Sequence, residues 1–210
     1  MLALNRISPC ALLAALLIAA PLACSGAELL DVSVELDDER YRLYSEVHFD
    51  VSQEAMYSLL TNFELFERFT SAIVESRNLP EDDQGRPGFY ARMEGCVLMW
   101  CKSFIREGYL MLSPRAEIVA IAKPEDSDFK YSRERWQLVP NGEGIVLIYD
   151  FEMVPDFWVP PVIGPYLIQR ALKGGAQRAV VRIEALALEQ EAINLGVENP
   201  YTTSDGEQLR

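Results

Sequence analysis

Hydrophobic and polar residues alternate over much of the chain with a period of two, which is the pattern of β-strands that bury one face. The stretch 41–49 shows it most clearly, because Tyr41, Leu43, Val47 and Phe49 fall on one side. The pattern predicts strands over residues 32–35, 41–49, 73–79, 89–94, 103–112, 117–122, 133–139 and 145–153. The last two strands form a hairpin across the turn at residues 141–144.

Helical spacing replaces this alternation in three places. Ser52 is a good N-cap for a short helix whose apolar stripe lies in residues 55–60. Phenylalanines spaced by three in residues 63–69 indicate a second short helix. A long helix is expected from Pro161 or Pro165 to about Glu191. Gly174 and Gly175 interrupt it, either for close packing on the sheet or as a flexible point.

The order of these elements predicts an α+β fold. A curved antiparallel sheet has one face to cover, and the C-terminal helix is the only long element available to cover it. We therefore expect the sheet to wrap around that helix, with two short helices after the first strand closing one end. Such an arrangement tends to leave an apolar cavity between the sheet and the helix.

Several segments resemble a known superfamily. The sequences VHFD at residues 47–50, WQL at 136–138 and PDFWVPP at 155–161 are similar to the START-like, or polyketide cyclase/dehydrase and lipid-transport (SRPBCC), superfamily. The resemblance covers roughly residues 40–190, and it is nearest to the coenzyme-Q-binding subgroup and to exported bacterial relatives. It implies the helix-grip fold. Members bind lipids, quinones, polyketides or hormones, and some catalyse cyclisation, so the resemblance does not fix the function.

The N-terminus of the 210-residue chain reads as an export signal, because one arginine precedes an apolar run over residues 11–20. Cleavage after Ala27 is expected; the competing interpretation is a lipoprotein signal with Cys24 acylated, which Pro21 disfavours. We expect a periplasmic protein, with or without a lipid anchor. The predicted parts are a signal at 1–27, a START-like domain at 28–193 and a flexible polar tail at 194–210.

Export changes how the cysteines are interpreted. Cys96 and Cys101 would remain in an oxidising compartment, where disulfides form. Positions five apart on one straight strand lie about 16 Å apart. The two can therefore pair only if the chain turns between them; the alternative is two separate thiols.

Charge and composition exclude several functions. The net charge of −13 disfavours nucleic-acid binding. His48 is the only histidine and alternates against apolar neighbours, so it is expected to face outward. No metal site, cofactor or catalytic residue is predicted.

The candidate ligand cavity takes its residues from the inward faces of the predicted strands. Arg106 would supply a guanidinium that meets a ligand carbonyl or headgroup, although a rival apolar face leaves the phase of its strand open. The apolar lining is expected from Trp136, Leu138, Tyr149 and Phe151.

The candidate cavity mouth lies between the last strand and the long helix, where the chain is almost continuously apolar. Its residues are Phe157, Trp158, Pro160, Pro161 and Tyr166. Here Trp158 would rest at a membrane interface and admit a lipid. The alternative is that Phe157 and Trp158 fold under the helix and seal the core.

Together these features predict a protein that binds or transfers an apolar small molecule, such as a lipid or a quinone, in the bacterial cell envelope, with peripheral membrane contact. An enzyme of the cyclase or dehydratase type on a polyketide-like substrate is the alternative. A structural partner of an envelope complex is the third.

Overall fold

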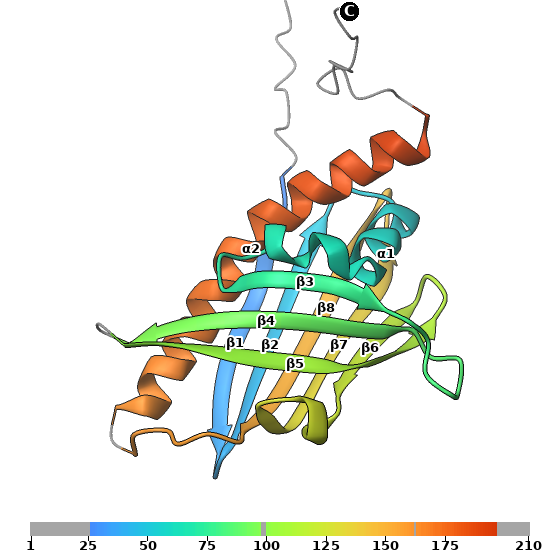
Figure 1. Cartoon of the computed structure of the whole chain (residues 1–210). Coiled ribbons are helices and arrows are strands. Elements are labelled where there is room, and N and C mark those ends of the chain that lie inside the picture. Colours follow the sequence, from blue (N-terminus) through green and yellow to red (C-terminus); the bar gives the residue numbers. More distant parts are fainter. Residues whose placement is uncertain (1–25, 98–99, 162, 197–210) are drawn as a thin grey trace, which may run out of the picture.

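The computed structural model describes residues 26–97, 100–161 and 163–196 (Figure 1). The elements are β1 (Glu28–Asp37), β2 (Arg40–Phe49), α1 (Gln53–Thr61), η1 (Phe63–Arg68), β3 (Ile73–Leu79), β4 (Gly88–Val97), β5 (Trp100–Ser113), β6 (Glu117–Ala122), η2 (Pro124–Asp126), β7 (Phe129–Asn141), β8 (Gly144–Pro155) and α2 (Gly164–Asn194). Here η1 and η2 are short 3₁₀ helices.

The strands form one antiparallel eight-stranded sheet in the order β1-β2-β8-β7-β6-β5-β4-β3. The sheet curves, and α2 lies across one side of it from lower left to upper right in Figure 1. The predicted α+β helix-grip fold is confirmed. Its inner face carries the alternating apolar side chains, and these make the core.

The two short helices close one end of the sheet for reasons visible in the sequence. The Ser52 hydroxyl accepts a hydrogen bond from the Ala55 amide, 3.3 Å away, and so caps α1. In η1, the Phe63 and Phe66 rings stack with centroids 3.9 Å apart, and Phe63 also lies 4.7 Å from Phe89 of β4. This aromatic cluster joins η1 to the sheet.

Several strands are longer than the hydrophobic pattern predicts. β7 begins at Phe129 rather than at residue 133, and β5 begins at Trp100 rather than at residue 103. The pattern fails there because the added residues carry charged side chains such as Lys130 and Lys102. Backbone pairing with the neighbouring strands still extends through them, since it does not depend on side-chain polarity.

Helix α2 is held most tightly at its C-terminal end. Leu186 and Ala187 are buried there. The Glu191 carboxylate accepts a hydrogen bond from the Ser52 amide at 3.0 Å, and Glu189 pairs with Arg68 at 2.8 Å. The first half of α2 faces the sheet through side chains that are only partly buried, namely Ile168, Leu172 and Ala176. The two halves of the helix are therefore packed to different degrees.

The predicted signal up to residue 25, including Cys24, lies outside the described residues, as does most of the predicted tail. Ala27, the last residue of that signal, donates its amide to Glu184 of α2, and β1 begins at Glu28. Within the described part of the chain, no helix has the length and hydropathy needed to cross a membrane.

The double glycine in α2 does not provide close packing on the sheet. A Cβ atom at Gly175 would have no heavy atom within 4 Å, and one at Gly174 would meet only the Arg178 guanidinium. The packing interpretation of these glycines is therefore wrong, and what they contribute is backbone freedom within the helix.

We expect Gly175→Ala to stabilise the fold by about 1 kcal/mol, because alanine restricts the unfolded chain and fits the open space. Urea unfolding followed by circular dichroism measures the change. Gly174→Ala is the matched variant and should gain less, since Arg178 must move. A destabilised Gly175→Ala protein would contradict the open environment at this position.

Candidate functional site

A charged residue lies inside the otherwise apolar face of the sheet. Arg106 of β5 is only 5% exposed. Its Nε donates to the Ser132 hydroxyl at 2.9 Å, and its Nη1 donates to the Glu134 carboxylate at 2.7 Å. Both partners lie on β7 and are themselves buried. The open question of the phase of β5 at Arg106 is thus answered: its side chain points inward and pairs with Glu134.

Tyr149 of β8 completes this cluster. Its hydroxyl donates to the second oxygen of Glu134 at 2.5 Å. Burial raises the pKa of Tyr149 well above its usual value, and the adjacent Glu134 carboxylate raises it further. The phenol therefore stays protonated near neutral pH and acts as a hydrogen-bond donor.

One nitrogen of the Arg106 guanidinium remains unused. Within the described residues, buried Nη2 has no hydrogen-bond partner. The guanidinium carbon lies 5.0 Å from the centre of the Phe151 ring and 5.7 Å from that of Phe89. A buried donor without an acceptor costs about 1–3 kcal/mol. The cluster thus presents one unsatisfied N–H among aromatic rings.

The residues predicted to line a cavity fall into two groups. Trp136 and Tyr149 lie side by side with ring centroids 5.8 Å apart, and Phe151 contacts the Arg106 guanidinium. Trp136 is itself only 4% exposed. Leu138 is buried two residues further along β7, and it belongs to the part of the core that contains Leu147. Leu138 shares this part of the core with Trp136, and Tyr149 packs against both it and the cluster that contains Phe151.

Sequence reasoning missed Glu134 and Ser132. The signal was present, because both alternate in phase with Trp136 on β7 and must share its inward face. Their contact with Arg106 could not be predicted, since β6 separates β5 from β7.

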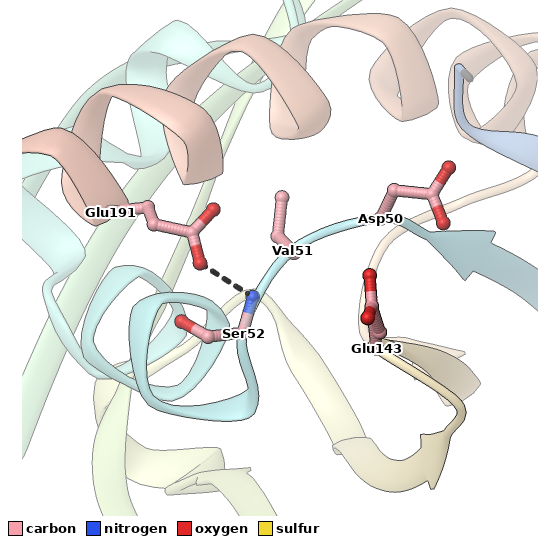
Figure 2. Close-up of a pocket in the computed structure, with 5 residues that line it drawn as sticks. All are labelled: Asp50, Val51, Ser52, Glu143 and Glu191. Atoms are coloured by element: carbon pink, nitrogen blue, oxygen red, sulfur yellow. Dashed lines mark hydrogen bonds between the residues drawn. The ribbon is translucent and has the colours of Figure 1, made fainter. Parts of the chain in front are cut away.

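A pocket of about 280 Å³ lies near the C-terminal end of α2, where Asp50, Val51, Ser52, Glu143 and Glu191 line it (Figure 2). Figure 2 shows Glu191 reaching from α2 to the Ser52 amide, with the Asp50 and Glu143 carboxylates on the opposite side. Three carboxylates make this pocket acidic. It differs in both place and polarity from the apolar cavity expected between sheet and helix.

Some of the predicted mouth residues pack against the sheet, whereas others are exposed to solvent. The centroid of the Phe157 ring lies 4.4 Å from that of Phe104 of β5 and 4.5 Å from Nζ of Lys102. Trp158, in contrast, is 77% exposed, and Tyr166 is 61% exposed. Phe157 therefore seals the core, whereas Trp158 does not fold under the helix.

The two proline positions belong to the turn that leads into α2. The Pro160 carbonyl accepts a hydrogen bond from the Gly164 amide at 2.9 Å. Pro160 is partly buried and Pro161 is exposed. The turn brings Val159 and Pro160 against Gly164, the first residue of α2.

The backbone at Cys96 and Cys101 does turn as a disulfide requires. The two residues are direct partners in the antiparallel register of β4 and β5. Partners in such a ladder have Cα atoms about 4.5–5.5 Å apart, which lies within the span of a disulfide.

The described residues contain no group of three or more histidine, cysteine or acidic side chains placed to hold an ion. His48 is partly exposed and lies 3.8 Å from Asp50, also at the surface.

The family is shown by the match of residues 40–187 to the profile described as polyketide cyclase / dehydrase and lipid transport. The chain belongs to this family. The coenzyme-Q-binding subgroup stays a prediction. A search of curated proteins finds no match.

Solved structures agree with the fold. Human STARD10 superposes with a TM-score of 0.58 at 12% identity, over 81% of this chain and 76% of that one. A STAR-related lipid transfer protein from Xanthomonas axonopodis superposes with a TM-score of 0.53 at 13% identity, over 76% of this chain and 98% of that one. The Zhui aromatase/cyclase from Streptomyces sp. R1128 superposes with a TM-score of 0.50 at 13% identity, over 73% of this chain and 94% of that one. At these identities the similarity establishes the fold alone.

We expect Glu134→Gln to destabilise the protein by about 3–5 kcal/mol, because it leaves the Arg106 charge buried without a counter-ion. The double variant Arg106→Met/Glu134→Leu should be more stable than Glu134→Gln, since it removes both charges. Chemical unfolding of both variants and of wild type tests this. If the double variant lost at least as much as Glu134→Gln, the ion pair would not be the source of the cost.

Proposed function

We propose that the protein binds an apolar small molecule carrying a hydrogen-bond acceptor, such as a lipid ester or a quinone, against the inner face of the sheet. The supporting observation is Nη2 of Arg106, a buried donor with no partner among the described residues. A carbonyl oxygen would satisfy this donor. Because Glu134 already balances the guanidinium charge, a neutral acceptor suits the site better than a second carboxylate.

The ligand would lie between the Arg106 cluster and the first half of α2. Phe151 and Tyr149 share an apolar cluster with Ile168 and Leu172 of that helix. These helical side chains are only partly buried, so the cluster is incompletely closed. Apolar side chains that are packed against each other but still partly exposed offer an apolar molecule surface to bury.

Binding is favoured over catalysis by the raised pKa of Tyr149. A general acid or base works best with a pKa near the working pH. The pKa of Tyr149 is raised well above 10, and the Glu134 carboxylate is held between Tyr149 and Arg106. Cyclase or dehydratase activity remains the alternative because the fold is shared with the Zhui aromatase/cyclase.

We further propose that the protein works in the periplasm, released after Ala27 or anchored at Cys24, and that Cys96 and Cys101 form a disulfide there. The cysteine register supports the disulfide, and the N-terminal sequence supports the export.

The ligand proposal is tested by competition against an apolar fluorescent dye, using two competitors of equal tail length. One is a decyl-substituted benzoquinone and the other is decylbenzene, which has no oxygen. A hydrogen bond from a charged donor contributes about 1.5–3 kcal/mol, so wild type should prefer the quinone by roughly 10- to 100-fold. Arg106→Met/Glu134→Leu should keep binding decylbenzene and lose the preference.

The matched control is Arg135→Met/Asp150→Leu, which removes an ion pair between β7 and β8 on the opposite face of the sheet. It should leave the preference for the quinone unchanged. Equal affinity of wild type for the two competitors would contradict a role for Arg106 in ligand recognition.

For the disulfide, we expect Cys96 and Cys101 to resist thiol alkylation in periplasmic protein until a reductant is added. Mass spectrometry of the tryptic peptides measures this. Cys101→Ser is the control and should expose one reactive thiol at Cys96. Rapid alkylation of both cysteines without reductant would contradict the pairing.

A further inference from the structure

The first half of α2 and the segment before it combine exposed aromatic and basic side chains. We infer that this surface docks on a bilayer of anionic phospholipid. We define the α2 docking face as Trp158, Ile163, Tyr166, Arg170 and Lys173. The inference names the membrane partner of the proposed function and rests on it for its biological purpose.

The apolar part of this face is unusually exposed. Trp158, Ile163 and Tyr166 are 77%, 50% and 61% exposed. Trp158 directly follows Phe157, whose ring is fixed against Phe104 of β5. Aromatic residues with a polar edge favour the boundary between lipid headgroups and acyl chains. A tryptophan next to a fixed neighbour can insert there without unfolding the segment.

Charge is segregated along the chain at this point. Residues 157–183 contain Arg170, Lys173, Arg178 and Arg182 but no aspartate or glutamate. The first turn of α2 also has no acidic residue, so the positive end of its dipole is not neutralised there. A stretch of this length without an acid stands out in a chain whose net charge is −13.

These cations are also free of local counter-ions. In the described residues, no ion pair involves any basic residue of α2. Most arginines of the sheet, in contrast, are paired, as Arg135 is with Asp150 and Arg92 with Glu75. The paired cations are already neutralised, whereas those of α2 can meet lipid phosphates.

Helical spacing places the cations beside the aromatic residue. Tyr166, Arg170 and Lys173 follow the i, i+4, i+7 pattern and share one face of α2. The Arg170 guanidinium lies 3.4 Å from the Tyr166 hydroxyl. Ile168 and Leu172 lie on the other side of the helix, where they pack toward the sheet. The aromatic and basic groups therefore point away from the core together.

Lys102 adds a cation from the sheet. Its Nζ lies 4.5 Å from the centre of the Phe157 ring, which precedes Trp158. Figure 1 shows the β4–β5 hairpin and the start of α2 on the left side of the molecule. Lys102 therefore contributes a cation from the sheet next to the residue that precedes Trp158.

The overall negative charge does not prevent such docking. At physiological ionic strength the screening length is about 8 Å, so charges elsewhere on the molecule act weakly at the contact. Each lysine or arginine close to an anionic surface then strengthens binding by about fivefold. Several unpaired cations together with an inserted tryptophan supply both parts of a peripheral membrane contact.

The test is flotation, with two kinds of vesicle, of exported protein from which the predicted signal has been cleaved; Cys24→Ser removes any acyl anchor. One kind of vesicle is phosphatidylcholine alone, and the other is an equal mixture of phosphatidylcholine and phosphatidylglycerol. We expect binding to the mixed vesicles and a steep loss at about 1 M salt. Arg170→Gln/Lys173→Gln should weaken that binding roughly 25-fold. Trp158→Ser should weaken it as well, with an unchanged melting temperature.

The matched control is Lys123→Gln/Arg133→Gln, which removes the same charge from two residues that also have no ion pair in the described part of the chain. It should bind like the parent. Equal binding to both vesicle types, or an equal loss in the control, would overturn the docking face. Dye competition in solution is measured on the same variants. Loss of vesicle binding with intact ligand binding by the Arg170/Lys173 variant separates this inference from the proposed function.

Discussion

A guanidinium inside an apolar core is the constraint around which this fold is arranged. Burying an unpaired charge costs several kcal/mol, so Arg106 requires a counter-ion at short range. Glu134 provides it at 2.7 Å, and Ser132 and Tyr149 satisfy further groups of the pair. These contacts link β5, β7 and β8 across the sheet. The cluster therefore fixes the relative positions of strands that are far apart in the sequence.

The buried ion pair is retained although not all of its hydrogen bonds are made. Two polar partners, Ser132 and Tyr149, contact the pair, yet Nη2 of Arg106 has no partner in the described residues. A core selected for stability alone would replace both charges by apolar side chains of similar size, which is often neutral or stabilising. Retaining a buried ion pair with one unused donor is the arrangement expected of a site that recognises a polar atom on an apolar ligand.

The hydrophobic pattern predicted the fold because a curved sheet with one long helix has few other ways to bury its apolar face. The cap of α1 and the aromatic spacing of η1 could also be predicted from the sequence, as Ser52 and Phe63 show. The contacts of the candidate site were harder to predict from the sequence. Arg106 and Glu134 lie on strands separated by β6, and no local spacing encodes that distance. The packing around Gly175 likewise depends on how far α2 stands from the sheet, which residue spacing along the helix does not determine.

Strand β5 connects the candidate ligand site to the Phe157 segment that precedes the α2 docking face. Lys102, Phe104 and Arg106 alternate along the strand and share its inward face, so the first and last are about 13 Å apart. Lys102 is exposed, Phe104 holds the Phe157 segment, and Arg106 is buried with its unused donor. Polarity along the strand changes from a solvated cation, through aromatic rings, to a buried donor. The strand therefore presents a graded environment between the solvent and the buried guanidinium, which suits the amphipathic ligand proposed above.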